Sequence, residues 1–410
     1  MNKSINISLQ KANYYDNLTI LFILLQVFGG LGGLFQPIRI FVFLSFPIIL
    51  FSFKYKINNS VYNYEILFFI FWIIYGIISL LWAIQPFEGI KELIILIFNF
   101  YSYFLLIYIA RRANNPYNSI IKGWTLLFIF TIPIALIEFI FDIHFSISYD
   151  SESQILNYGF VTIRRVFASV TYMNLNGYNT MLCYMMPFVF SNLLYNFSKI
   201  KATAFWILNL LLGYIVIING SRAAFINFLI CLILFSYFYV NRKRSFFKLL
   251  GIFLLTSIIT IYFFYDIFNL ISIRLLGEGI NDFQRMQIIS SGWDAFIKSH
   301  FWGVGAGNFM PVMEQVYKQS LTSPHNFLLE IAVQYGFLIL VLFIGLFFRL
   351  YKKQKNNQSK FTKFIILSAL FTFPLLSIID SSYIISPYPW IFISSLFIIA
   401  NNTKNIEYHD

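Results

Sequence analysis

Three residues whose side chains suit chemistry on a phosphate lie in the second half of the chain: Arg222, Arg285 and His325. Arg222 stands in the segment 218–225, after Gly220 and Ser221 and between two long apolar runs. A charged side chain costs about 3 kcal/mol or more at the centre of a bilayer, so a charge beside apolar spans usually has a function. Ser221 is a good N-cap, and a guanidinium beside the free N–H groups of a helix N-terminus suits a phosphate. The structural alternative is an arginine that snorkels to lipid headgroups.

His325 follows Ser323 and Pro324. Serine is a common N-cap and proline is tolerated at the first helical position, so this order predicts that His325 lies in the first turn of a helix over 326–348. A helix N-terminus disfavours an imidazolium, and a neutral imidazole can act as a general base. The structural alternative is an interfacial histidine that caps a helix.

Arg285 belongs to a segment, 281–296, in which Ile288, Ile289, Trp293 and Phe296 recur at helical spacing. The spacing predicts an amphipathic helix on the outer surface. The structural alternative for Arg285 is a solvated charge on that helix. Together, the two arginines and the histidine favour a site for an anionic, lipid-borne substrate.

Other polar residues carry weaker signals. Arg164 and Arg165, with Asn174 and Asn176, form a second basic and amide cluster that could contact sugar or diphosphate. The histidines at 144, 300 and 409 and the acids at 138, 142, 266, 330 and 380 have no evident partner in the sequence. The segment 303–308 is a glycine-rich turn with the wrong spacing for a nucleotide fingerprint. No metal-ligand pattern occurs, so we expect neither a metal nor a cofactor.

The composition indicates a polytopic membrane protein. The 410 residues are 59% hydrophobic and 11% charged, and apolar runs of about 20 residues predict membrane helices. We therefore expect an all-α fold in a single membrane domain over 1–410. The twelve expected spans are 18–35, 38–53, 64–83, 90–110, 120–141, 171–195, 202–219, 222–240, 246–264, 326–348, 361–379 and 384–400. The stretches 142–170 and 265–325 are too polar to span, and the larger one is expected to hold amphipathic helices.

The distribution of basic residues predicts the orientation. With both termini in the cytoplasm, the inner segments hold 20 of the 29 Lys and Arg residues, as the positive-inside rule requires. Both polar stretches then lie outside. The net charge of +12 follows from this topology, and no nucleic-acid motif accompanies it. Cys183 and Cys231 lie in predicted spans, which indicates buried free thiols.

Four motifs in a fixed order resemble the O-antigen polymerase and ligase superfamily. They are Gly-Ser-Arg-Ala-Ala at 220–224, Arg285 with Trp293, the segment 300–309, and His-Asn-Phe-Leu-Leu-Glu at 325–330 with Gly336 downstream. The resemblance covers about residues 205–345. It implies a metal-independent glycosyltransferase of the bacterial inner membrane, which uses a glycan on undecaprenyl diphosphate at the periplasmic face. Arg222 and Arg285 would bind the diphosphate, His325 would be the base or position the acceptor, and Asn326 would contact substrate.

The chemistry of these residue types agrees with that activity. Departure of a lipid diphosphate builds negative charge, which two arginines and two helix N-termini can stabilise. Attack from the opposite face would invert the anomeric centre. We favour a polymerase, which joins lipid-linked repeat units with a chain-length regulator as a partner, over a ligase, which transfers the glycan to lipid A-core. A flippase of polysaccharide or lipid is the alternative from another class; it would need charges along a central cavity.

Overall fold

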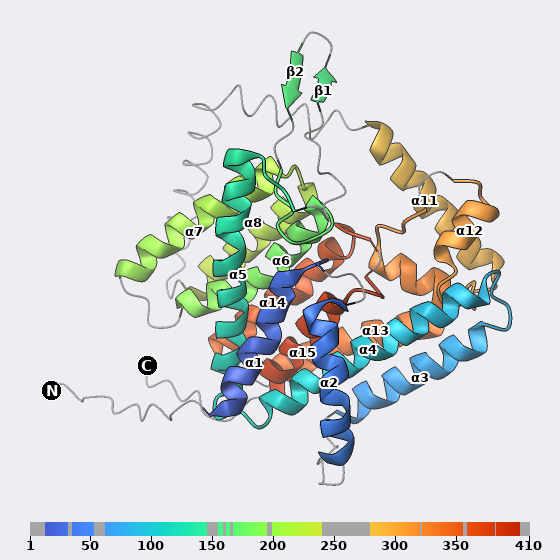
Figure 1. Cartoon of the computed structure of the whole chain (residues 1–410), viewed down its shortest axis with the longest axis horizontal. Helices are drawn as coiled ribbons and strands as arrows, with labels where there is room; N and C mark the ends of the chain where they lie inside the picture. The colour runs from blue at the N-terminus through green and yellow to red at the C-terminus, as the bar shows by residue number, and fades with distance from the viewer. Residues whose placement is uncertain are drawn as a thin grey trace.

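Apolar helices form most of the protein in the computed structural model (Figure 1), which describes residues 13–31, 35–52, 62–145, 155–158, 161–164, 167–194, 199–239, 279–319, 322–355, 359–381 and 383–401. The helices are α1 (Tyr14–Leu24) with the 3-10 turn η1 (Leu25–Phe28), α2 (Pro37–Ser52), α3 (Asn63–Ser79), α4 (Pro86–Ala110), α5 (Pro116–Phe141), α6 (Leu175–Leu194), α7 (Lys199–Ile218), α8 (Arg222–Tyr239), α11 (Gly279–Lys298), α12 (Phe309–Gln315), α13 (Phe327–Lys355), α14 (Lys360–Leu376) and α15 (Pro387–Asn401).

Helices occupy every expected span except 246–264, which lies outside the described residues. Three of them, α4, α5 and α13, are long and apolar enough to cross a membrane, and several others are apolar but shorter. The all-α prediction is therefore confirmed for the bundle. The total of twelve crossings stays a prediction.

The helix ends that were assigned to the cytoplasm lie together at one end of the bundle. The Arg349 Nε atom lies 3.5 Å from the buried Glu65 carboxylate, which joins α13 to the start of α3. Lys353 donates to the Asn401 side chain at 2.6 Å, which adds the end of α15. Asp16, in the first turn of α1, accepts from the backbone N–H groups of the turn before α5. Which side of a membrane this end faces remains a prediction from the charge distribution.

Two further contacts join other turns. Gly30 N–H donates to Thr171 O at 2.8 Å, and Phe327 N–H donates to Ser377 O at 2.7 Å. The turn after η1 thus lies beside the segment before α6, and the start of α13 lies beside the end of α14.

Two helices lie at the centre of the bundle. From Gly177 to Ser191, α6 is buried on all sides, and α15 is buried from Pro389 to Ala400. The surrounding helices expose apolar side chains on their outer faces, for example Ile74 and Ile140. A helix that is apolar all round is either buried or faces lipid, and both kinds are present here.

A short β-hairpin departs from the all-α prediction. Strands β1 (Ile155–Tyr158) and β2 (Val161–Arg164) pair antiparallel within the first of the two polar stretches. Both strands are rich in residues that favour extended backbone, such as Ile155 and Val161. The stretch was recognised as too polar to span, but its local pairing was not predicted.

A break in α13 ties the larger polar stretch to the bundle. Gly336 has φ 77° and ψ −180°, so the helix kinks there. A kink leaves carbonyl groups without helical partners. Val304 N–H and Gly305 N–H donate to the freed carbonyls of Val333 and Gln334, at 2.7 and 3.1 Å. The glycine-rich turn was predicted, and its structure explains the glycines.

The same turn is held on its other side by α3 and α4. Gly307 N–H donates to the Glu92 carboxylate at 3.0 Å, and Tyr335 OH donates to the same oxygen at 2.7 Å. Asn308 exchanges two hydrogen bonds with the backbone of Gln85. Buried polar groups of this kind are costly unless they are all paired. The turn 303–308 is therefore part of the bundle end.

Helices α11 and α12 form a small second core beside the bundle (Figure 1). Ile288, Ala295 and Phe296 of α11 are buried against Leu329 and its neighbours at the start of α13. Met286 and Trp293 on the other side are exposed. The segment predicted as an amphipathic helix, 281–296, is therefore a helix with one buried face, but Trp293, which was predicted to belong to the apolar stripe, is exposed.

Replacing Gly336 should destabilise the fold. A Cβ there would lie 2.5 Å from Trp302 O and 2.6 Å from Phe301 O, both rigid backbone atoms, and a positive φ alone costs a non-glycine residue about 1–3 kcal/mol. We expect Gly336→Ala to lower the thermal midpoint in detergent by several degrees or to prevent insertion. The control is Gly213→Ala in α7, whose Cβ would make ordinary contacts at 3.6 Å. Equal midpoints for the two variants would contradict the role of the break.

Candidate active site at one end of the bundle

His325 and Arg285 lie close enough to interact electrostatically. Burial and, to a smaller extent, the nearby guanidinium of Arg285 together lower the pKa of His325 to about 4. The Nδ1 atom of His325 is buried and has no hydrogen-bond partner among the described residues. The imidazole is therefore neutral at physiological pH and can accept a proton.

The packing of α11 on α13 brings this pair together. Gly292 faces Leu329 so closely that a Cβ at this glycine would lie 3.0 Å from the leucine side chain. Arg285 lies two turns before Gly292, and His325 lies four residues before Leu329. The tight contact between the two helices thus sets both chemical groups at the same end of the pair.

The capping predicted for this segment is wrong in detail. Helix α13 begins at Phe327, and Leu329 N–H donates to the Asn326 side chain at 3.1 Å, so the N-cap is Asn326 and not Ser323. His325 precedes the helix with φ 43°, in the left-handed region. The proline was read as a helix start, but here the chain is still irregular two residues after it. Neutrality of His325 was predicted, although its cause is burial and Arg285, not a place in the first turn.

Arg222 is the first residue of α8, and its side chain is exposed. Gly220 has φ 70°, and Ala224 N–H donates to Ser221 Oγ at 3.4 Å, so the turn and the serine cap are as predicted. Helix α8 packs on α14, α6 and α7, whereas α11 packs on α13 and α12. The structure therefore pairs Arg285 with His325, and the participation of Arg222 in the same site stays a prediction.

Two of the three amides predicted to bind substrate cap helices. Asn174 Oδ1 accepts from Gly177 N–H at 2.7 Å and so caps α6, as Asn326 caps α13. Asn176 is half-buried in the first turn of α6. Arg164 ends strand β2, opposite Ile155, and Arg165 lies outside the described residues. Substrate binding by these five residues remains a prediction.

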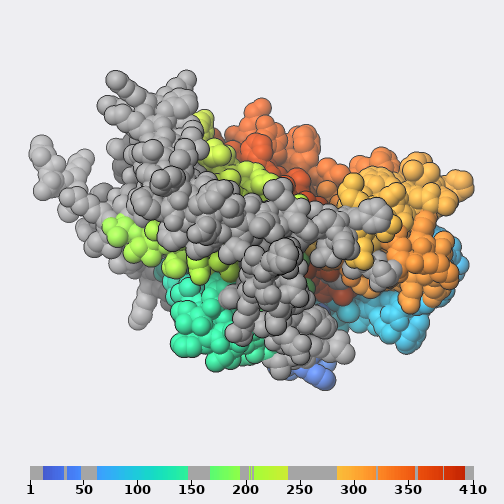
Figure 2. All heavy atoms as spheres, turned by 90° about the horizontal axis from the view of Figure 1, so that it is seen from above, coloured from blue at the N-terminus to red at the C-terminus, as the bar shows by residue number. Residues whose placement is uncertain are grey.

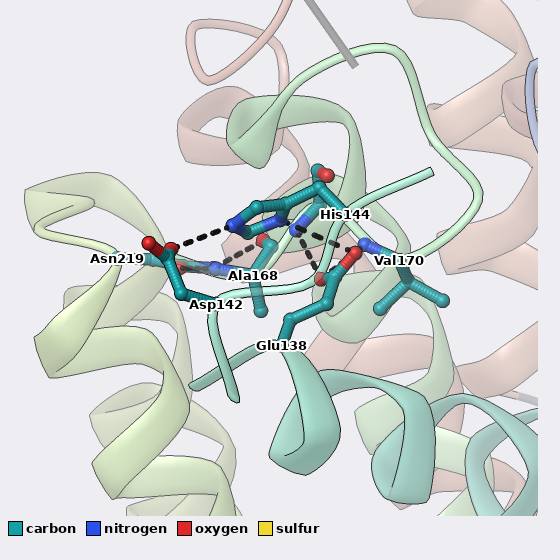
Figure 3. A network of polar contacts seen from close by, with 7 residues as sticks. Glu138, Asp142, His144, Ala168, Val170 and Asn219 are labelled. Atoms are coloured by element: carbon teal, nitrogen blue, oxygen red, sulfur yellow. Dashed lines mark hydrogen bonds and ion pairs between the residues drawn. The ribbon is translucent and has the colours of Figure 1, made fainter. Parts of the chain in front are cut away.

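A second polar cluster lies where α5 ends (Figure 3). His144 is buried, with Nε2 3.1 Å from Asp142 and Nδ1 3.5 Å from Glu138. Its ring stacks on Phe167, with centroids 4.2 Å apart. The expectation that His144, Glu138 and Asp142 have no partner is therefore wrong. Their sequence signal is the spacing of two acids one turn apart with a histidine two residues later.

This cluster clamps the chain that leads into α6. Glu138 accepts from Ser169 N–H and Val170 N–H, both at 2.8 Å (Figure 3). Val170 has φ 55°, which is unfavourable for a β-branched residue. Asn219 accepts from Ala168 N–H at 2.8 Å and donates to Ala168 O at 3.1 Å. The clamp therefore joins α5 and the segment before α6 to the turn before Arg222.

Two more acids that seemed isolated in the sequence have partners. Glu330 accepts from Tyr383 N–H at 3.1 Å. Burial raises the pKa of Asp380 to about 6, which hydrogen bonds from the Ser381 backbone and the Asn174 side chain oppose. His300 is exposed, and Asp266 and His409 lie outside the described residues. In the described part of the chain, no group of three or more His, Cys, Asp or Glu residues could hold a metal ion.

The cysteines behave as predicted. Cys183 and Cys231 are both free and buried, within α6 and α8. They take no part in the candidate site, whose chemistry rests on a neutral imidazole and a neighbouring guanidinium. Such a pair can take a proton from a hydroxyl and bind a phosphate oxygen.

The His325 pKa can be measured directly, because the chain has only four histidines. We expect the His325 signal in ¹³C-labelled protein to titrate near pH 4. Arg285→Gln should raise the midpoint, because it removes a neighbouring positive charge. The control Lys298→Gln changes an exposed charge on the same helix that pairs with Asp294, and it should leave the midpoint unchanged. A wild-type midpoint at the ordinary value of about 6.5 would contradict the described environment.

Comparison with known proteins agrees with the motifs. Residues 207–344 match the family model described as O-antigen ligase, a range that includes Arg222, Arg285 and His325. The chain is also 23% identical over 361 residues to the teichuronic acid biosynthesis protein TuaE of Bacillus subtilis strain 168, an alignment that covers 82% of this chain and 71% of the relative. The resemblance to the O-antigen polymerase and ligase superfamily that was drawn from the four motifs is therefore confirmed.

Proposed function

We propose that the protein is a membrane glycosyltransferase that polymerises a surface polysaccharide. It would transfer a glycan from undecaprenyl diphosphate to a sugar hydroxyl of another lipid-linked repeat unit, at the periplasmic face of the inner membrane. The observation that carries this proposal is the pairing of a neutral His325 with Arg285, in a segment that matches the family model.

The proposed reaction needs a base and a site for developing negative charge. His325 takes the proton of the attacking hydroxyl, because its imidazole is neutral and its buried Nδ1 atom has no other hydrogen-bond partner among the described residues. As the bond from the anomeric carbon to the diphosphate oxygen breaks, Arg285 stabilises the charge on the leaving group. Arg222 binds the same diphosphate, and the free N–H groups at the start of α8 add to the positive potential. Attack opposite the leaving group inverts the anomeric centre, and no metal or cofactor takes part.

A ligase is the second candidate. The matching family model is described as O-antigen ligase, which favours this activity. The Bacillus relative is named for teichuronic acid biosynthesis, and that name does not specify a ligase. Both activities require the same handling of the donor, so His325 and the arginines do not distinguish them. The acceptor distinguishes a polymerase from a ligase, and a genetic test can identify it.

Deletion of the gene separates the two activities in a host whose glycan is attached to lipid A-core. For a polymerase, we expect single repeat units on the core, because ligation continues. The measurement is a gel of extracted lipopolysaccharide with analysis of the carrier lipid. Bare core together with long polymer on the carrier lipid would contradict the polymerase and identify the protein as a ligase.

Conservative replacement of the arginines tests the diphosphate site. We expect Arg222→Lys and Arg285→Lys each to reduce polymer formation by at least about tenfold, because a point charge does not reproduce a bidentate guanidinium contact. Protein levels should persist. The control Arg111→Lys lies at the other end of the bundle, beside Tyr62, and should retain activity. Near wild-type polymer formation in both test variants would contradict the proposal that Arg222 and Arg285 bind the diphosphate.

A further inference from the structure

A polar cavity lies between α11 and the segment that follows α12, beside the turn of α11 that carries Arg285. Its volume is about 360 Å³, which is within the range of small-molecule sites. Figure 2 shows residues 284–319, in gold and orange, along one side of the molecule. The cavity is lined by Gln284, Gln287, Ser290, Ser291, Tyr317, Lys318 and Gln319.

The lining has the chemistry of a site for hydroxyl groups. Its side chains are three amides, two aliphatic hydroxyls, one phenol and one ammonium, with no carboxylate. Amides and hydroxyls both donate and accept, as paired sugar hydroxyls require. Lys318 adds a positive charge, so the lining suits a neutral or anionic ligand and disfavours a cationic one.

One atom of the lining lacks a partner. Gln319 donates from Nε2 to Ser291 Oγ at 2.6 Å and to Gln287 O at 3.3 Å, which fixes the orientation of its amide. Its Oε1 atom is buried and accepts no hydrogen bond from the described residues. A buried acceptor left unpaired is unfavourable, and a hydroxyl group that donates to it would satisfy it.

The wall of the cavity is held in place before any ligand binds. Tyr317 OH donates to Asp294 at 2.7 Å, and Lys298 pairs with the same carboxylate at 2.6 Å. The Gln319 backbone N–H donates to Met313 O at 3.0 Å. Preorganised polar groups bind a ligand with less loss of conformational entropy. Gln284 and Gln287 flank Arg285 in sequence. The cavity and Arg285, which is proposed to bind the diphosphate, therefore lie on the same turn of α11.

We propose that this cavity is a saccharide subsite, which binds the hydroxyls of one neutral or anionic sugar of the glycan next to the reacting end. The inference rests on the proposed function, since it names where that enzyme holds its sugar. The same hydroxyls are present in the donor glycan and in the acceptor glycan. Separate kinetic measurements on the two substrates distinguish them.

Filling the cavity tests the subsite without removing a hydrogen bond that the structure shows. Ser290 is exposed at the rim, so Ser290→Trp should block the cavity, while Gln315→Trp, at an exposed position of α12 outside the lining, should leave it open. We expect Ser290→Trp to raise the KM of one glycan substrate at least about tenfold, equivalent to about 1.4 kcal/mol, with kcat retained at saturation. Gln315→Trp should change the same KM by less than about twofold. The substrate whose KM rises is the occupant.

A binding measurement makes the test independent of turnover. The probe is the delipidated repeat oligosaccharide, released by mild acid from the host's own polysaccharide and mixed with the purified full-length protein in nanodiscs. We expect saturation-transfer NMR signals with the wild type that are lost in Ser290→Trp and kept in Gln315→Leu, which changes an exposed amide of α12 outside the lining. Gln287→Leu, at a second exposed lining position, replaces Ser290→Trp if that variant does not fold.

The outcomes separate the two proposals. Unchanged KM values for both glycans in a folded Ser290→Trp protein, or no saturation transfer in the wild type, would overturn the subsite while leaving the transferase intact. Failure of the protein to transfer glycan from any polyprenyl diphosphate, with saturation transfer still present and lost in Ser290→Trp, would reject the proposed function and retain a saccharide site.

Discussion

The break in α13 at Gly336 is the constraint on which the candidate site depends. A straight helix would pair the carbonyls of Val333 and Gln334 internally and leave nothing for the turn 303–308 to bind. Because the helix opens there, Val304 and Gly305 donate to those carbonyls, and Phe337 donates back to Phe301 O. Glu92 secures the other side of the turn through Gly307. A backbone break within a buried region is stable only when its polar groups are paired in this way.

This anchoring places α11 against the first turns of α13. The contact of Gly292 with Leu329 is close because the glycine has no side chain, and the small core around Ile288 and Phe296 adds apolar burial. Arg285 and His325 meet as a consequence of that packing. Their electrostatic relation differs from a salt bridge, because burial, with a smaller contribution from the cation, keeps the histidine neutral. A site of this kind offers a base and a cation together near neutral pH.

The Glu138 clamp performs a comparable task at the other polar stretch. Asp142 adopts φ 56° at the end of α5, which turns the chain back so that His144 lies beside Glu138. The carboxylate uses its second oxygen on the backbone of Ser169 and Val170. Asn219 connects the same segment to the turn before α8. Glu138 and Glu92 thus act in a similar way, because each carboxylate accepts a backbone N–H from one of the two polar stretches.

The sequence by itself determined the helices and the types of chemical group. Apolar runs placed the helices of the bundle because apolar length and burial in a membrane follow from composition. It also indicated the serine cap before Arg222, the glycine turn at 303–308 and the amphipathic character of α11. Each of these depends on residues within a few positions of one another, so local spacing carries the information.

Only the tertiary structure decided which distant groups meet. Arg285 is 40 positions from His325, and Glu138 is 31 positions from Ser169, so no local pattern relates them. The unusual backbone at His325 and Asp142 also escaped prediction, because a left-handed residue is stabilised by partners that arrive from elsewhere. The polar cavity beside α11 depends on Gln319 crossing to Ser291. The cavity forms because two segments of the chain pack against each other, and the sequence alone does not reveal that packing.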